Sequence, residues 1–69
     1  MNKDIIKGNW KQIKGMVREK WGEISHDDID RMEGNYDQIV GKIQETYGKS
    51  KEEAENEFNS WINQQNIHR

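Results

Sequence analysis

The sequence contains no cysteine, no proline and no leucine, and each absence narrows what the chain can be. Without cysteine there are no disulfides, thiolate zinc sites or cysteine nucleophiles, and the chain fits a reducing compartment. Without proline, long helices are favoured over a fold rich in loops. Without leucine, the three Trp, two Tyr and one Phe must supply most of the volume of a core.

Long hydrophobic runs are also absent, because no apolar stretch exceeds two residues. This excludes a transmembrane helix and a secretory signal, so the N-terminus reads as that of a mature protein. With 35% charged residues and a mean hydropathy of −1.31, the chain is unusually hydrophilic for one that folds. Sixty-nine residues allow a single domain with a thin core.

The charges that are present are unevenly spread. Residues 1–22 hold six basic and two acidic residues, whereas residues 23–69 hold five basic and eleven acidic ones. Such asymmetry indicates either a basic contact surface or attraction between the two parts of the chain. Attraction is the simpler interpretation in a domain this small.

Apolar residues recur at helical spacing in four segments, which predict helices over 3–21, 26–33, 35–47 and 51–63. Gly22, Gly34 and Gly48 are the expected stops, and Ser25 and Ser50 the expected N-caps. The positions expected to be most buried are Trp10, Ile13, Val17, Trp21, Tyr36, Ile39, Ile43, Tyr47, Phe58 and Trp61.

An internal repeat relates residues 8–22 to residues 34–48, with seven of the fifteen positions identical at a constant offset of 26. The repeated unit is a long helix, a glycine stop and a Ser-capped helix, which is an αα-hairpin. We therefore predict an all-α domain spanning residues 1–69. It comprises two duplicated α-hairpins, about 8–33 and 34–62, packed at a steep angle as a SAM-like helical array, followed by a frayed tail over 63–69.

The repeat preserves a second face of the long helices, roughly opposite the apolar one. It consists of small and polar residues: Gly8, Asn9, Gln12, Gly15 and Glu19 in the first copy, and Gly34, Asn35, Gln38, Gly41 and Glu45 in the second. A partner or ligand could approach such a surface. A tight crossing of the hairpins, or common ancestry of the copies, also explains this face and is the favoured interpretation.

Patterns that carry catalytic or metal chemistry are weak. His26 and His68 share no helix face, which argues against a metal site. Ser25 and Ser50 are caps by position, without the motif of a nucleophile. The carboxylates form solvated faces, and no phosphate-binding loop is present. We therefore expect that the protein is not an enzyme and that it binds neither a cofactor nor a metal ion.

A basic stripe on the first helix offers a nucleic-acid hypothesis. Lys7, Lys11, Lys14 and Arg18 follow helical spacing beside the apolar face. The loop after Trp21 holds one glycine and places Glu23 where a phosphate would sit, and the pI is near 5.6. A solvated flank is therefore favoured over a phosphate track, and nucleic acid is not expected as a partner.

The ordered motifs resemble the CsbD-like family of small bacterial stress-response proteins, and within it the YjbJ-like branch. The resemblance is carried by 8–12, 14–15, 21–22, 27–28, 33–34, 37–45 and 47–48. It implies a small α-helical, cytoplasmic protein made under general stress, with no established activity or ligand. The chain departs from the family pattern at Met16, where Lys is common, and at Ile24 and Ile39, where Leu is common.

Together these observations predict a non-enzymatic stress-response protein that acts as a protective or interaction module. The alternative is a weak nucleic-acid-binding module that uses the basic stripe. The partner is unknown, with no membrane expected and a protein partner left open.

Overall fold

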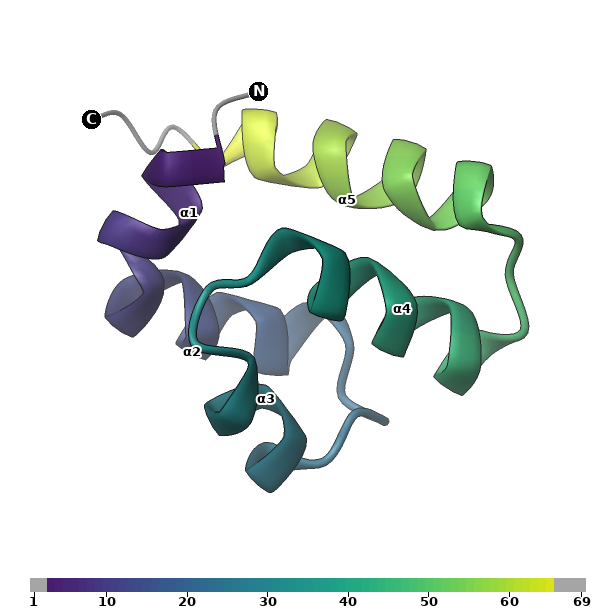
Figure 1. Ribbon diagram of the computed structural model, residues 1–69, viewed down its shortest axis with the longest axis horizontal. Coiled ribbons are helices and arrows are strands. Elements are labelled where there is room, and N and C mark those ends of the chain that lie inside the picture. The colour runs from purple at the N-terminus through teal and green to yellow at the C-terminus, as the bar shows by residue number, and fades with distance from the viewer. Residues whose placement is uncertain (1–2, 66–69) are drawn as a thin grey trace.

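In the computed structural model, residues 3–65 are described, and they form five α-helices and no strand (Figure 1). The predicted all-α class is confirmed. The helices are α1 (Lys3–Gly8), α2 (Trp10–Lys20), α3 (His26–Met32), α4 (Tyr36–Tyr47) and α5 (Lys51–Gln64). Residues 66–69 of the predicted tail lie outside the described residues.

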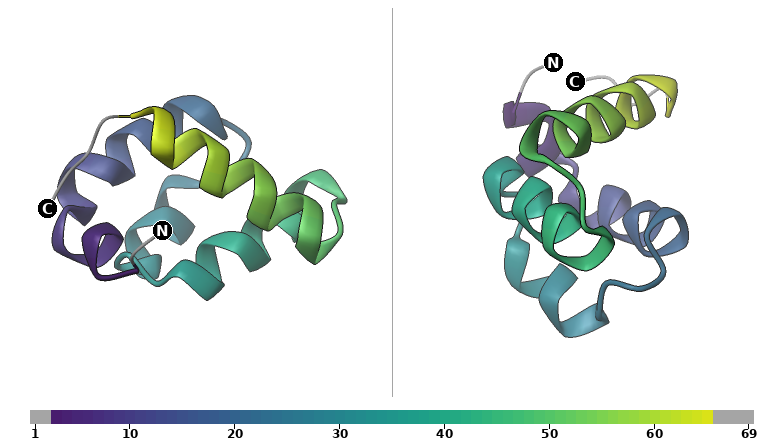
Figure 2. Two further views of the ribbon diagram at one scale, coloured as in Figure 1. Left: turned by 90° about the horizontal axis from the view of Figure 1, so that it is seen from above. Right: turned by 90° about the vertical axis from the view of Figure 1, so that its right-hand side faces the viewer.

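The helices surround one interior. α4 and α5 run side by side in opposite directions and are joined by the short loop 48–50 (Figure 1). In the view from above, α5 runs between α2 and α4 (Figure 2), and α3 packs against both α2 and α4. Ser25 and Ser50 cap α3 and α5 as predicted, and Ser50 and Glu53 form a complete capping box.

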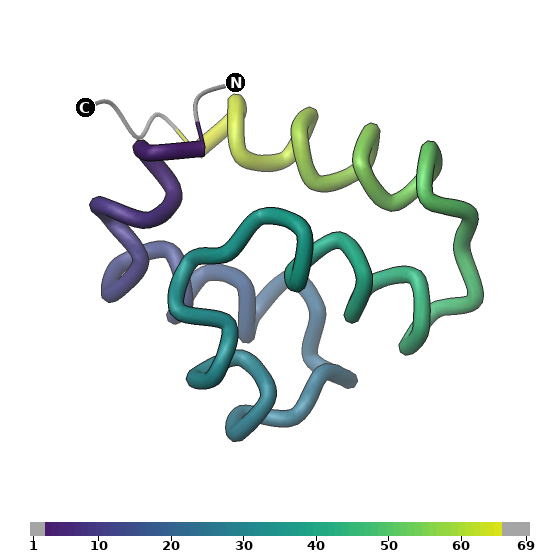
Figure 3. Tube along the Cα trace, in the orientation of Figure 1, coloured from purple at the N-terminus to yellow at the C-terminus, as the bar shows by residue number. Residues whose placement is uncertain are grey.

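The prediction of a single helix over 3–21 is wrong, because the chain bends at Asn9 and forms two helices, α1 and α2 (Figure 3). The backbone N–H and the side-chain Nδ2 of Asn9 both donate to the carbonyl oxygen of Ile5, each at 3.0 Å. An asparagine that bonds locally to the backbone competes with helix propagation, and the preceding Gly8 weakens the helix further. Ile6, which precedes the bend on α1, lies in the interior and is fully buried.

The turn between α3 and α4 packs directly on this bend. Gly34 has φ +82°, and a Cβ added to it would lie 2.8 Å from Lys7 Cα and 3.2 Å from the Ile6 carbonyl oxygen. Only glycine combines that backbone conformation with so close an approach. The neighbouring Glu33 is also left-handed, with φ 51°.

Gly15 and Gly41 do not mark a tight helix crossing, so that explanation of the repeated glycines is wrong for this pair. A Cβ added to either would meet no other atom within 4 Å. Both residues are exposed in the middle of a helix, where glycine is unfavourable by about 1 kcal/mol relative to alanine. Nothing in the packing explains why they are glycines.

Eight of the ten positions expected to be most buried are buried, whereas Tyr47 and Trp61 are only half-buried. The Tyr47 ring extends to the loop after α2, where its hydroxyl accepts a hydrogen bond from the Glu23 N–H at 3.2 Å. Trp61 lies at the edge of the core. The other buried hydrophobic positions are Ile6, Ile24, Ile29, Met32, Val40, Ala54 and Ile62.

Aromatic rings around Phe58 join three parts of the chain. The Phe58 ring centroid lies 5.8 Å from those of Trp21, Tyr36 and Trp61, and Trp21 and Trp61 meet edge-to-face at 4.8 Å. Each such pair contributes about 0.5–1.5 kcal/mol beyond the burial of its area. This cluster ties the end of α2 and the start of α4 to α5.

The environments of the glycines predict opposite effects of the same substitution. Gly34→Ala should lower the free energy of unfolding by roughly 2 kcal/mol or more, since it adds a clash to a strained backbone. Gly15→Ala should raise it by about 0.5–1 kcal/mol, because the added methyl meets no obstacle. Urea denaturation of the two variants measures both values. Equal effects of the two substitutions would contradict the packing of Gly34 on the bend.

Candidate functional site

The basic stripe is divided between two helices and is partly occupied by an internal partner. The bend places Lys7 on α1 and the other three residues on α2. Asp30 of α3 brings its Oδ1 within 3.2 Å of Lys14 Nζ and 3.8 Å of Arg18 Nη2. A phosphate at this end of the stripe would therefore have to displace a carboxylate.

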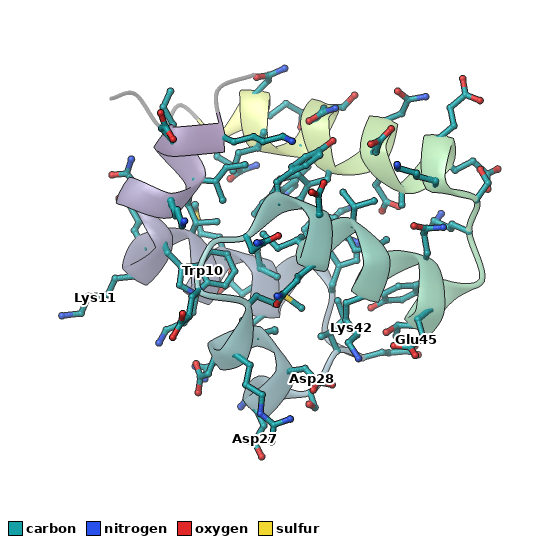
Figure 4. The ribbon with its side chains drawn as sticks, in the orientation of Figure 1. Trp10, Lys11, Asp27, Asp28, Lys42 and Glu45 are labelled. Carbon is teal, nitrogen blue, oxygen red and sulfur yellow. The ribbon has the colours of Figure 1, made fainter. Side chains whose placement is uncertain are left out.

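The other end of the stripe is open to solvent. Lys7 and Lys11 are exposed, and Lys11 points away from the body of the molecule (Figure 4). Two exposed lysines on two different helices make a small electrostatic footprint. The four residues predicted as one site thus divide into a paired half and an exposed half.

Ion pairs connect the basic first part of the chain to its acidic remainder, as expected from the charge asymmetry. Lys3 Nζ lies 3.9 Å from Asp37 Oδ1, and Lys20 Nζ lies 3.8 Å from Glu57 Oε2. Like the two pairs made by Asp30, each of these contacts joins a basic residue of the segment 1–22 to an acidic residue of the segment 23–69. Exposed pairs of this kind are worth at most about 1 kcal/mol each, so they help to orient the helices more than they stabilise the fold.

The repeated small and polar residues do not share one environment. Eight of them are exposed, Asn9 is half-buried and Gly34 is buried beneath the bend. The two asparagines also do different work. Asn9 donates to the Ile5 carbonyl where α1 ends, whereas Asn35 Oδ1 accepts from the Gln38 N–H and caps α4. A contact surface formed by the eight exposed residues stays an untested prediction, and common ancestry of the copies stays the alternative.

A charged network between α3 and α4 was missed by the sequence reasoning. Lys42 Nζ lies 3.3 Å from Asp28 Oδ2 and 2.8 Å from Glu45 Oε1, and Arg31 Nη1 lies 3.9 Å from Asp28 Oδ1 (Figure 4). The spacing of Lys42 and Glu45 was a visible signal, but the contact with Asp28 needs the folded chain. Lys42 therefore connects α4 to the first turn of α3.

The same network shifts the protonation of its members. A hydrogen bond from Lys42, followed by one involving Ser25, lowers the pKa of Asp28 below its usual 3.8. Hydrogen bonds to Glu45 and Asp28 raise the pKa of Lys42 above its usual 10.5. Both shifts favour the charged pair at neutral pH.

A shallow hollow opens between α2 and α5, with a volume of about 260 Å³. It is lined by Met16, Glu19, Lys20, Trp61 and Gln65. Met16 and Trp61 are half-buried and pack against the core from this side. We refer to it as the α2–α5 hollow.

The described part of the chain contains neither a cluster of metal-binding side chains nor a membrane-spanning helix. Residues 3–65 contain no group of three or more His, Asp or Glu residues that could hold a metal ion. His26 is exposed at the start of α3, while His68 lies outside the described residues. Within the same range no helix has the length and apolar character needed to cross a membrane.

The sequence defines the class of protein to which this small helical domain belongs. The family model described as CsbD-like matches residues 4–56, and the chain belongs to this family. It is 57% identical over 61 residues to UPF0337 protein YjbJ from a strain of Escherichia coli, which covers 88% of each chain.

Other relatives match over the whole length or nearly so. Identity is 49% over 69 residues to UPF0337 protein pc0632 of Protochlamydia amoebophila, covering 100% of both chains. It is 52% over 65 residues to UPF0337 protein msl9551 of Mesorhizobium japonicum, covering 94% of this chain and 97% of the relative. No solved structure gives a significant match.

The lowered pKa of Asp28 predicts a loss of stability in acid. A carboxylate whose folded pKa is depressed stabilises the fold above its unfolded value, and the contribution disappears as pH falls through the folded value. The melting temperature of the wild type should therefore exceed that of Asp28→Asn at pH 6, and the gap should shrink below pH 3.8. Thermal denaturation monitored by circular dichroism across pH 2–7 measures the gap.

Two variants control this experiment. Asp27→Asn removes a carboxylate of the same helical turn that points away from Lys42 (Figure 4). Lys42→Met removes the partner, and in that background Asp28→Asn should have a smaller effect. An undiminished effect of Asp28→Asn without Lys42 would contradict the assignment of the shift to this contact.

Proposed function

We propose that the chain is a non-enzymatic stress-response protein of the cytoplasm that acts through its folded, charged surface as a protective or interaction module. The observation that carries the proposal is the division between interior and surface. All fifteen buried side chains among residues 3–65 are hydrophobic, and no polar or charged side chain of that range is buried. The groups available to a partner are therefore mainly hydrated charges and amides held on a fixed helical frame, beside the half-buried Met16, Tyr47 and Trp61.

The family supports the stress-related part of this proposal. The chain belongs to the CsbD-like family, and the resemblance that first indicated this family implies production under general stress. The composition agrees, because 35% charged residues and a mean hydropathy of −1.31 suit a protein that works in water without burying a substrate.

A protective module and an enzyme differ in stoichiometry. Heating a labile reporter enzyme with increasing amounts of this protein should preserve activity only when the mole ratio approaches or exceeds about one, because each molecule acts by contact. The retained reporter activity, plotted against the mole ratio, is the measurement. Full protection at trace amounts would indicate turnover and would contradict a non-enzymatic role.

A matched variant tests whether the folded surface is needed. Ile39 is completely buried, so Ile39→Asp should unfold the chain while leaving its length and hydrophilic character almost unchanged. We expect this variant to protect less than the wild type at equal mole ratio. Equal protection would show that hydrophilic chain alone is sufficient, which would overturn the role of a folded module.

We further propose that the single domain consists of two related hairpins, α2 with α3 and α4 with α5. The support is the offset of 26 between residues 8–22 and 34–48, together with the contacts of α2 with α3 and of α4 with α5. α1 has no counterpart before α4, since the chain there consists of the short turn around Gly34.

The alternative function is weak nucleic-acid binding through the basic stripe. Exposed Lys7 and Lys11 favour it, whereas the contacts of Asp30 with Lys14 and Arg18 oppose it. If all four residues contacted phosphates of duplex DNA, the affinity would fall with salt at a log–log slope of about −3.6.

We predict no measurable binding of duplex DNA at physiological salt. Fluorescence anisotropy of a labelled duplex, titrated at two salt concentrations, measures this directly. The control carries Gln at Lys7, Lys11, Lys14 and Arg18. Micromolar binding that weakens steeply with salt and is abolished in the control would establish the alternative and refute the prediction.

A further inference from the structure

The two methionines of the described residues differ in their access to solvent, because one of them lines the α2–α5 hollow and the other lies in the core. Met16 is half-buried on α2 and lines the hollow, which is large enough to admit small solutes. Met32 on α3 is 3% exposed and belongs to the buried core. The same chemical group is thus held in two different degrees of contact with solvent.

A methionine thioether in contact with solvent is a target for peroxide. The sulfur attacks one oxygen of hydrogen peroxide, an S–O bond forms as the O–O bond breaks, and the released hydroxide takes the proton of the sulfur-bound hydroxyl group to leave as water. The sulfur loses two electrons to the peroxide, and the product is methionine sulfoxide. We propose that Met16 is a peroxide-modified site and that its oxidation loosens the packing of α2 against α5.

The packing around Met16 explains why its oxidation would affect the contact between α2 and α5. Met16 and Trp61 pack against the hydrophobic core from the two helices that form the hollow. Oxidation replaces an apolar sulfur by a strongly polar sulfoxide, which disrupts apolar packing. The sulfoxide oxygen also requires a hydrogen-bond donor, and the hollow is lined by the polar Glu19, Lys20 and Gln65 as well as by Met16 and Trp61.

Two donors line the hollow, and both already take part in contacts that involve α5. Lys20 Nζ lies 3.8 Å from Glu57 Oε2, and Gln65 Nε2 donates to the carbonyl oxygen of Trp61 at 3.0 Å. A sulfoxide oxygen that recruits either donor draws it away from that contact. Recruitment of Lys20 would thus weaken the link between α2 and α5, and recruitment of Gln65 would weaken the last turn of α5.

This inference does not depend on the proposed function. A protein that protects by contact, or one that binds nucleic acid, would carry the same methionine at the same hollow. The reaction also needs no catalytic group of the chain, because the oxidant is hydrogen peroxide itself.

The site selectivity is tested on the full chain of 69 residues. Brief treatment with dilute hydrogen peroxide, followed by peptide mass spectrometry, gives the oxidation rate of each methionine separately, with Met1 assigned by its own peptide. We expect Met16 to react about ten times faster than Met32 or more, since Met32 reacts only when the core opens locally. Equal rates in the folded protein would overturn the proposal.

The structural consequence has its own readouts and its own variants. In the wild type, oxidation should lower the melting temperature and increase quenching of tryptophan fluorescence by acrylamide as Trp61 becomes more exposed. Met16→Leu preserves apolar volume without an oxidisable sulfur and should show neither change, whereas Met32→Leu should respond as the wild type does.

Reversal completes the test, because methionine sulfoxide reductases restore the thioether. Treatment of the oxidised protein with both stereospecific reductases should return the melting temperature to its starting value. The proposal fails if Met16→Leu is destabilised by peroxide as much as the wild type. It also fails if complete oxidation of Met16 leaves melting and quenching unchanged.

Discussion

The approach of Gly34 to the bend between α1 and α2 is the constraint on which the rest of the structure depends. A Cβ at this position would lie 2.8 Å from the Lys7 backbone, so the two segments meet with no side chain between them. This contact fixes where the chain turns from α3 to α4. It also holds α1 in the position in which Ile6 fills the interior. A core without leucine has little spare volume with which to bridge a wider gap.

The charges complement this thin core. Basic residues from the first part of the chain meet acidic residues from the remainder, as Lys14 and Arg18 do at Asp30 and Lys20 does at Glu57. Each pair is weak in water, but together they favour one arrangement of the helices over others of similar apolar burial. Many of the basic groups of the first part of the chain are therefore paired with carboxylates of the same molecule. For this reason fewer residues of the basic stripe are free to contact a phosphate than their spacing indicates.

The elements that sequence predicted well are those governed by local rules. Serine caps, the positions of the last three helices and most of the apolar face follow from spacing and terminal residues. The bend at Asn9 could not be foreseen in this way. The dipeptide Gly-Asn occurs twice, at 8–9 and at 34–35, and in both copies the asparagine holds the N-cap position of the helix that follows, α2 or α4. The copies differ in the side chain, because Asn9 bonds back to the Ile5 carbonyl at the end of α1, whereas Asn35 accepts from the Gln38 N–H of α4.

For the candidate site too, residue spacing alone does not reveal the contacts that form only when the helices pack together. Spacing identified the basic stripe, but its division by the bend and its pairing with Asp30 depend on how α3 docks on α2. Ile24 was not expected in the core because it lies in a loop, outside any periodic pattern, and yet it is buried. The half-burial of Trp61 likewise reflects its place at the edge of the aromatic cluster, which no helical wheel describes.

That cluster has a consequence for how the molecule can be observed. Two indoles whose ring centroids lie 4.8 Å apart, edge-to-face and in contact with Phe58, sit in an asymmetric environment that exists only in the packed state. Near-ultraviolet circular dichroism of such rings reports side-chain packing separately from helix content. The protein thus carries an intrinsic optical label at the junction of α2 and α5, and its tertiary order can be followed without any added dye.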